Sequence, residues 1–475
     1  MVVKLTPTFK FTPKLQAGLL FLGCILLITR ITVKPYAQSS HESKPIPLQT
    51  SWRSMSPRRA PQVLDIIEQD YADRIDWTFL TPVSEPPNVK SFLRYNSSKR
   101  IPMPHLSTDP RYTSRPREAS SLGGRIAFIN GHHGTSDDFA YVTHQLGIQF
   151  SEFNPRAFWF YGVDERRAED VNRHGNLGDF FCRSFDTVVV GDTIPDSRFL
   201  LQHLDRIINK TTTESNETDN TTRLCQIRRI IMMTTNRFDF GFKPLELPSY
   251  HALVRRVTIK SHELGARSRG IPKIIWTANN PFDIKYAEVA LGSDIGQFTL
   301  IRSVGYSTLP VVKPFPKEVT ELPAVYNHYD ESRFIAWLMR NDINVSVFSR
   351  NYGGPTSLSQ FRCFIDFPYQ ASTMKMYENL LFGVVTLVPS KRLFLSRELG
   401  GYIIEGHRVS NWQDYVEYWY EDMHDYVYVF DSITELKEIL ARPVIDVRNI
   451  RERGEGVWKA WNAKSIAEWR RILSM

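Results

Sequence analysis

Short apolar, β-branched runs alternate with longer mixed segments between about residues 123 and 304. The runs have the length of buried strands, and the segments between them have the helical or loop character of crossover connections. We expect strands at residues 123–130, 157–161, 187–190, 229–234, 273–277 and 298–304. Strands that alternate with helical segments indicate a parallel sheet. The pattern therefore predicts an α/β domain over residues 120–310.

A second α/β domain is predicted over residues 311–475, after a proline-rich interdomain linker at residues 309–323. Its expected elements are a helix at 331–340, strands at 343–349 and 363–367, a helix from about 372 to 382, and a strand at 384–388. Ser372 and Thr373 are N-cap residue types, and Gly383 suits the left-handed residue that ends a helix. The last strand is a β-branched run, which is typical of a parallel strand covered on both faces.

The N-terminal segment predicts a membrane anchor. Lys4, Lys10 and Lys14 precede an apolar stretch over residues 15–33, which is long enough to span a bilayer if Arg30 reaches the headgroups. The basic residues favour a cytoplasmic tail at residues 1–14 and a luminal body. A cleaved signal peptide that ends near Ala37 is the alternative, but Pro35 fits a cleavage site poorly.

Residues 34–119 have the composition of a stem, with prolines spread among serines and arginines. One segment, Val63 to Tyr71, has apolar residues at helical spacing and is a candidate helix docked on the body. We therefore predict a tail, an anchor, a stem and two α/β domains in that order.

Composition excludes several classes of protein. The net charge is +8, but the basic residues are scattered and no zinc-finger or RNA-binding signature occurs, so we expect no nucleic-acid partner. Of the four cysteines, Cys24 lies in the apolar N-terminal stretch. In an oxidising lumen Cys182 and Cys225 are the pair we would expect to bond, since both fall in the first domain. Three buried thiols, with Cys363 as the third, are the alternative.

Five Asn-x-Ser/Thr triplets agree with a luminal body. They begin at Asn96, Asn209, Asn216, Asn220 and Asn344. Three of them fall in the polar stretch at residues 209–222, where a glycan would not disturb a core.

One motif resembles a known family. The run Tyr377 to Val385 is similar to the Glu-Ala-x-x-x-Gly-x-Pro-Val segment in the donor domain of GT-B glycosyltransferases. The resemblance implies two Rossmann-like α/β domains that face each other across a cleft, and a final helix, here at about 457–472, that returns to the first domain. It also implies that Glu378 holds the ribose hydroxyls of a nucleotide sugar. The chain departs from the pattern at Val384, where the family has proline, and at Gln370, where many members have a second glutamate near the donor sugar.

Candidate contacts for the donor diphosphate surround Glu378. The helix start at Ser372 and Thr373 offers free N–H groups, and Lys375 lies one turn before Glu378 on the same face. Arg350, beside the glycine pair at 353–354, offers a fork of donors that matches phosphate oxygens. For Lys375 the alternative is a surface pair with Glu378, and for Arg350 an ordinary exposed arginine.

The candidate base follows the first strand. His132 and His133 lie in a glycine-flanked loop at the carboxyl edge of the predicted sheet. In inverting enzymes of the similar family, a histidine here takes the proton of the acceptor hydroxyl and an aspartate orients it, which points to Asp137 or Asp138. The alternative is that this loop makes a turn and caps the next helix. Inversion and retention both remain open.

These observations predict a glycosyltransferase that moves a hexose from a UDP- or GDP-linked donor to a hydroxyl of a glycan or glycoprotein. No Asp-x-Asp triplet occurs, so we expect no bound metal and no cofactor besides the nucleotide sugar. Anchor and stem suggest a single-pass type II protein of the Golgi membrane, with the endoplasmic reticulum as the alternative. A catalytically inactive glycan-binding or scaffolding protein is the second hypothesis, motivated by Gln370, and a sugar-phosphate epimerase the third.

Overall fold

The computed structural model describes residues 93–95, 124–155, 159, 162–213, 225–264, 270–305, 321–326, 332–348, 354–399, 409–442 and 447–474. All of them belong to one compact unit, Arg58–Met475. The predicted anchor, the candidate helix at 63–71 and most of the linker lie outside these residues. Within the described ranges, no helix is both long and apolar enough to cross a bilayer.

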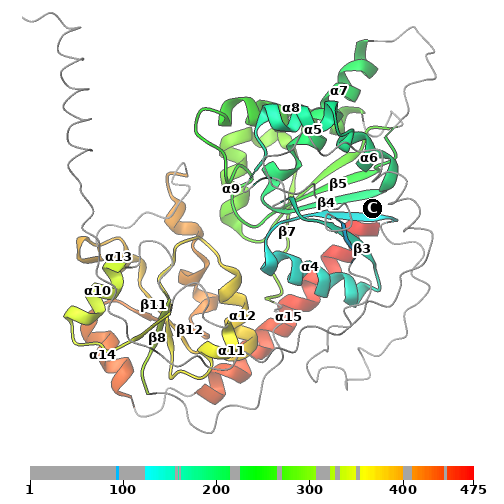
Figure 1. Cartoon of the computed structure of the whole chain (residues 1–475). Coiled ribbons are helices and arrows are strands. Elements are labelled where there is room, and N and C mark those ends of the chain that lie inside the picture. Colours follow the sequence, from blue (N-terminus) through cyan, green and yellow to red (C-terminus); the bar gives the residue numbers. More distant parts are fainter. Residues whose placement is uncertain are drawn as a thin grey trace, which may run out of the picture. The chain divides into compact units, whose positions relative to one another are not determined.

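The first sheet has seven strands in the order β1-β3-β2-β4-β5-β6-β7 (Figure 1). They are β1 (Leu93–Tyr95), β2 (Ile126–Ile129), β3 (Phe150–Phe153), β4 (Thr187–Asp192), β5 (Arg229–Thr234), β6 (Lys273–Ala278) and β7 (Phe298–Leu300). Every neighbouring pair is parallel except β1 and β3, which are antiparallel. The predicted parallel sheet is confirmed.

Helices cover both faces of this sheet. They are α4 (His133–Leu146), α5 (Glu165–Arg173), α6 (Leu177–Ser184), α7 (Arg198–Thr213), α8 (Leu247–Leu264) and α9 (Pro281–Leu291). Val188 and Val190 of β4 pack into one core with residues of α7 and α8, whereas Val189 packs into a second core with Phe139 of α4. Because successive strand residues point to opposite faces, a continuous apolar run is what a doubly covered strand requires.

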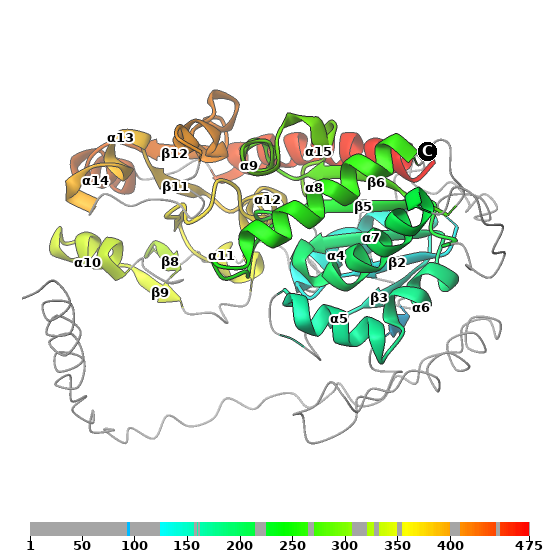
Figure 2. The same ribbon diagram turned by 90° about the horizontal axis from the view of Figure 1, so that it is seen from above.

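The second sheet has five parallel strands in the order β12-β11-β10-β8-β9. They are β8 (Ala324–Tyr326), β9 (Ser346–Phe348), β10 (Phe364–Ile365), β11 (Thr386–Pro389) and β12 (Val427–Phe430). Around them lie α10 (Ser332–Arg340), α11 (Pro355–Leu358), α12 (Met374–Phe382), α13 (Lys391–Phe394) and α14 (Ile433–Ala441) (Figure 2). We refer to the two sheets with their helices as the N-terminal and C-terminal lobes.

Helix α12 forms as its sequence predicts. Thr373 is the N-cap, and its hydroxyl accepts a hydrogen bond from the backbone N–H of Met376 at 3.3 Å. Gly383 closes the helix in the left-handed conformation, with φ of 64°. The following strand β11 is buried along its whole length. The loop, helix and strand around Glu378 are thus confirmed.

The last helix, α15 (Val447–Ser474), joins the two lobes. It contacts α12 of the C-terminal lobe and α4 of the N-terminal lobe (Figures 1 and 2). Trp469 of α15 lies 5.3 Å from Phe139 of α4, measured between ring centroids. The end of the chain therefore completes the core of the N-terminal lobe, and the return of the last helix that the resemblance implies is confirmed.

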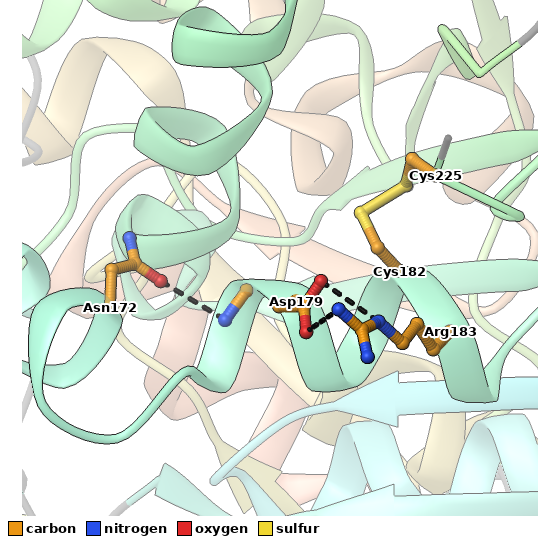
Figure 3. The surroundings of a disulfide bond; sticks show 6 residues. Asn172, Asp179, Cys182, Arg183 and Cys225 are labelled. Atoms are coloured by element: carbon orange, nitrogen blue, oxygen red, sulfur yellow. Dashed lines mark hydrogen bonds and ion pairs between the residues drawn. A yellow bond between two sulfur atoms is a disulfide. The ribbon is translucent and has the colours of Figure 1, made fainter. Parts of the chain in front are cut away.

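A disulfide joins Cys182 of α6 to Cys225, the residue that begins the segment leading into β5 (Figure 3). The pairing we expected from the sequence is present, and Cys363 is a free, buried thiol. The bond closes a loop that contains Asn216 and Asn220, which lie outside the described residues. Of the other triplets, Asn209 on α7 and Asn344 before β9 are exposed, and Asn96 is not described.

Several elements differ from the sequence expectations. Strand β1 falls inside residues 34–119, which we assigned to a stem. Strands β3, β8 and β12 were not predicted, because they are short and β3 contains the polar residues Ser151 and Glu152. The strand predicted at 298–304 ends at Leu300, and the chain continues to Gly305 without regular secondary structure. Most of the range 157–161 is not described.

Candidate functional site

A pocket lies where the two lobes meet. From the N-terminal lobe it is lined by Thr235, Asn236 and Arg237 after β5, and by Asn280, Phe282 and Asp283 after β6. From the C-terminal lobe it is lined by Gln370, Ala371 and Ser372, between β10 and α12. Its free volume is about 10 Å³, which is room for a group about the size of one water molecule. The carboxyl ends of strands from both parallel sheets therefore meet here, which is where open α/β sheets bind ligands.

Carboxylates follow three neighbouring strands of the N-terminal lobe. Asp192 ends β4 with φ of 57°, a left-handed conformation that is unusual for a residue other than glycine. It accepts hydrogen bonds from the hydroxyls of Thr235 and Thr193, each at 3.1 Å. Backbone strain of this kind gathers at functional sites. The other two carboxylates are Asp239, after β5, and Asp283, after β6.

Asp239 is ionised, and its carboxylate is bonded by two side chains of the same lobe. Its carboxylate is 2% exposed and accepts hydrogen bonds from His251 Nε2 at 2.9 Å and from the Tyr286 hydroxyl at 2.8 Å. Burial raises the pKa of Asp239, but these two hydrogen bonds and the charge of Arg237 outweigh it and hold the pKa below the usual value. Arg237 also lies over the ring of Tyr286, 5.5 Å from its centroid.

Asp283 is in a different state. It lies in the first turn of α9, is 3% exposed, and its Oδ2 accepts a hydrogen bond from the amide of Asn280 at 2.9 Å. Its backbone N–H donates to Asn280 Oδ1, so Asn280 caps the helix and also holds the Asp283 carboxyl group. Burial raises the pKa of Asp283 to about 7. The negative charges of Asp192 and Asp239 act in the same direction, while Asn280 and Arg237 act against it.

Lys375, a predicted diphosphate contact, lies in a buried ion pair. Its Nζ is 2.8 Å from Oδ1 of Asp366, and both side chains are buried. The ammonium group also faces the rings of Tyr326 and Phe364. The surface pair with Glu378 that we considered as an alternative is therefore not formed.

Ser372 and Thr373 belong to a buried hydrogen-bond network at the start of α12. The Thr373 hydroxyl is 2.8 Å from that of Tyr418, and the Ser372 hydroxyl is 3.0 Å from that of Tyr377. Tyr377 in turn donates to Glu417 at 2.5 Å, and Glu417 forms an ion pair with Arg302. Tyr418 is fully buried in the core. Trp412 also lies in this core, and Trp419 packs against it.

The segment 301–305, which follows β7, holds this helix start against the N-terminal lobe. Asp138 of α4 accepts from the Ser303 hydroxyl at 2.9 Å and from the Val304 backbone N–H at 3.0 Å. Gly305 has φ of 64°, and a Cβ added to it would lie 2.5 Å from the carbonyl carbon of Tyr377. Only glycine fits so close to the backbone of α12.

Glu378 lies on α12 beside this segment. It is half-buried, and it makes no hydrogen bond or ion pair with any residue that the structure describes. Burial and the negative charges of Asp138 and Asp137 raise its pKa to about 8, and the charge of Lys375 acts in the opposite direction. A half-buried carboxyl group without a partner is costly to the folded protein, and such groups gather at functional sites.

His132 caps α4. Its Nδ1 accepts a hydrogen bond from the backbone N–H of Thr135 at 3.2 Å. While Nδ1 accepts this bond, it is not available to take a proton from an acceptor hydroxyl. This is the capping role that we considered as the alternative for the loop. Asn130 fixes the loop further, because its amide donates to the carbonyl of His132 at 2.8 Å.

The structure thus brings some predicted site residues together and separates others. Gln370 and Ser372 line the pocket; among the described residues, Glu378, Lys375, Thr373, Asp137 and His132 do not. Arg350 lies outside the described residues, and the roles of His133 and Asp137 stay predictions. The sequence reasoning did not select Asp192, Arg237, Asn280 or Asp283. Polar residues directly after the buried strand at 273–278 were the available signal.

Among known proteins, only solved structures show similarity to this chain in the comparisons made. No protein-family model matches the chain, and no curated protein matches it. The structure is similar to the glycosyltransferase SnogD from Streptomyces nogalater, with a TM-score of 0.36, 13% identity, and coverage of 74% of this chain and 99% of that one. It is also similar to the glycotransferase of kitacinnamycin, with a TM-score of 0.32, 12% identity, and coverage of 72% and 98%.

The cap geometry predicts that His132→Asn keeps the protein folded. Asparagine is among the best N-cap residues, and its side-chain oxygen can accept from Thr135 as Nδ1 does now. We expect a Tm close to that of the wild type, whereas His132→Ala should lose about 1 kcal/mol of stability. Thermal denaturation of the three proteins measures this. Equal destabilisation by asparagine and alanine would contradict the capping role.

The pKa of Glu378 predicts a pH-dependent gain in stability for Glu378→Gln. Between the ordinary pKa of 4.5 and about 8, the folded protein holds a proton that the unfolded chain has lost. Stability of the wild type therefore falls as pH rises through this window, while glutamine does not titrate. The Tm of Glu378→Gln relative to wild type should rise between pH 4.5 and 8 and then level off, by a few degrees in total.

The control for that series is Glu438→Gln, at an exposed position of α14. The Tm difference between Glu438→Gln and the wild type should not grow with pH in the same way, because this side chain lies in solvent. A Tm difference between Glu378→Gln and the wild type that stays constant over the same pH range would show that the Glu378 carboxyl is not held in its neutral form.

Proposed function

We propose that the protein is a glycosyltransferase that transfers a hexose from a nucleotide-sugar donor to a hydroxyl group of a glycan or glycoprotein. The observation that carries this proposal is the state of Glu378. The resemblance assigns this residue to the ribose of the donor, and no residue that the structure describes bonds its carboxyl group. Vicinal ribose hydroxyls would supply the two hydrogen bonds that the group lacks.

The architecture supports the proposal. Two parallel α/β sheets and a last helix that returns to the first lobe are what the resemblance implies. The pocket between the lobes joins polar residues of both, which suits a site where a donor held by one lobe meets an acceptor held by the other.

The start of α12 has a positioning role in this proposal. The hydroxyls of Ser372 and Thr373 and the ammonium group of Lys375 are engaged in buried contacts, so they hold the helix in place. The donor diphosphate would meet the N-terminal end of α12, whose partial positive charge favours anions, together with Arg350. Gln370 lines the pocket and would face the donor sugar.

We propose a luminal location in the secretory pathway, in the Golgi membrane or the endoplasmic reticulum. The disulfide between Cys182 and Cys225 supports an oxidising compartment. The exposure of Asn209 and Asn344 supports glycosylation at these triplets. The anchor at residues 15–33 would hold the protein in the membrane as a type II protein. UDP or GDP would be the nucleotide, and we expect no metal ion.

A second candidate function is a glycan-binding or scaffolding protein that has lost catalysis. Gln370 favours it, because an amide lines the pocket where many members of the similar family have a carboxylate. Such a protein would bind a glycan in the pocket and have no use for an unpartnered carboxyl group at Glu378.

A panel of nucleoside diphosphates separates the two functions. UDP, GDP and ADP, with CMP as the monophosphate used by another donor class, are added without metal to the full-length protein and to Glu378→Ala. A nucleotide at 100 times its dissociation constant stabilises by about 2.7 kcal/mol, which is a shift of about 2 to 4 °C for a body of this size. We expect UDP or GDP to shift the wild type and Glu378→Ala to respond much less. No shift with any of the four would favour the scaffold.

A further inference from the structure

The pocket between the lobes contains one carboxyl group that the predictions from sequence do not use. We propose that Asp283 is the catalytic base of the transfer reaction and that the pocket around it is the subsite for the acceptor hydroxyl. This inference rests on the proposed glycosyl transfer. It replaces the imidazole after β2 with a carboxylate after β6.

Asp283 lies at the edge of the N-terminal sheet where the two lobes meet. It lies in the first turn of α9, immediately after the carboxyl end of β6, and it lines the pocket together with Asn280 of its own lobe and Gln370 of the other. A hydroxyl group in this pocket would meet amide groups that can bond it and a carboxylate that can accept its proton. His132 is not among the residues that line the pocket, and its Nδ1 is occupied by the cap.

The Asp283 carboxyl group is held by Asn280 and lies among three charged residues. Asn280 fixes the carboxyl group through Oδ2, so the orientation of the side chain is set before a substrate binds. The charged groups around it are Arg237 after β5, Asp239 after β5 and Asp192 at the end of β4. The residues of the C-terminal lobe that line the pocket, Gln370, Ala371 and Ser372, carry no charge.

These neighbours give Asp283 a pKa suited to the task. Burial and the two aspartates raise its pKa to about 7, although Arg237 and Asn280 oppose them. A general base is most effective when its pKa lies near the operating pH, and an ordinary aspartate is too weak a base to do this well. Asp239, by contrast, is held ionised by His251 and Tyr286 and contributes the charge that keeps Asp283 basic.

The step balances as a single displacement. The acceptor hydroxyl oxygen attacks the anomeric carbon and forms the new glycosidic bond. The bond from that carbon to the diphosphate oxygen breaks, and its electron pair leaves with the nucleoside diphosphate. The hydroxyl proton passes to Asp283 and then to water. Attack from the side opposite the leaving group inverts the anomeric carbon, so the inference also predicts an inverting enzyme.

The test uses Asp283→Asn, because asparagine keeps an oxygen that can accept from Asn280 and should preserve the helix cap. The full-length wild type and variant are incubated with UDP-glucose, UDP-N-acetylglucosamine, GDP-mannose and GDP-fucose, each with water or methyl glycosides as acceptors. Release of nucleoside diphosphate is followed from pH 5 to 9. We expect kcat to fall by about 10² to 10⁴ in the variant, which is the usual contribution of general base catalysis.

Two further readouts separate a catalytic role from a structural one. The rate of the wild type should rise with pH through about 7 and then level off, and this inflection should disappear in Asp283→Asn. The response to UDP or GDP should be unchanged in the variant, and its Tm should not fall below that of the wild type, because the wild type loses stability as pH rises toward the raised pKa of Asp283 and asparagine does not titrate. The matched control is Glu435→Gln, which alters an acid at the equivalent capping position of α14, far along the chain from the pocket. It should leave kcat unchanged.

The possible outcomes decide between the two proposals. If the wild type binds a nucleoside diphosphate and releases it from a donor, but Asp283→Asn keeps its kcat or the product retains its configuration, the role of Asp283 falls and the transferase stands. Binding without release from any of the donors also overturns the role of Asp283, since it requires a competent site. If the wild type neither binds nor releases nucleotide, the transferase falls and this inference falls with it.

Discussion

The site depends on how the segment 301–305 is held between the lobes. Its backbone and side chains bond to α4 through Asp138, and Trp458 and Ser465 of α15 donate to the carbonyls of Val304 and Arg302. Arg302 reaches the C-terminal lobe and pairs with the fully buried Glu417, while Gly305 lies directly against the backbone of α12. Because the same segment contacts α4, α12 and α15, it ties α12 of the C-terminal lobe to the N-terminal lobe. Loss of one of these buried contacts would leave a charge or donor without a partner.

That arrangement explains why Glu378 is left unsatisfied. Helix α12 is anchored near its start by the hydrogen bonds of Thr373 with Tyr418 and of Tyr377 with Glu417, and at its end by the left-handed Gly383. With the helix fixed, Glu378 is carried to a position beside Asp137 and Asp138 where no described cation or donor bonds it. The carboxyl group of Glu378 therefore lowers the stability of the folded protein, and hydrogen bonds from the hydroxyl groups of a ligand would offset this cost. Natural proteins often accept such local destabilisation at functional sites.

Local elements with strong signals were predictable from the sequence. The buried strands β4, β5 and β6, and the cap residues of α12, follow from apolar runs and residue types that act within a few positions of one another. Strand β3 was missed because the polar residue Glu152 interrupts its apolar pattern. In the structure the Ser136 hydroxyl donates to the Glu152 carboxylate. The partner that makes a polar strand residue acceptable lies on another element, and the sequence pattern does not reveal it.

The site was predictable only in part, for the same reason. The motif around Glu378 is local, so the sequence identified it, and Gln370 and Ser372 were correctly placed near a carboxyl edge. The burial of Lys375 against Asp366 was not visible, because the two residues meet only when β10 and α12 pack together. The state of Asp283 depends on Asp192 and Asp239, which follow different strands. Both the burial of Lys375 and the pKa of Asp283 depend on contacts between elements that are far apart in the sequence.

The central claim is that Glu378 holds the ribose hydroxyls of a nucleotide. The most direct measurement is a cycle of dissociation constants, with wild type and Glu378→Ala each titrated with UDP or GDP and with the corresponding 2′,3′-dideoxy analogue. If the claim holds, removing the hydroxyls weakens binding to the wild type by about 10-fold or more and hardly affects the variant, because the hydrogen bonds have already been lost. An equal loss in both proteins would show that Glu378 does not contact the ribose.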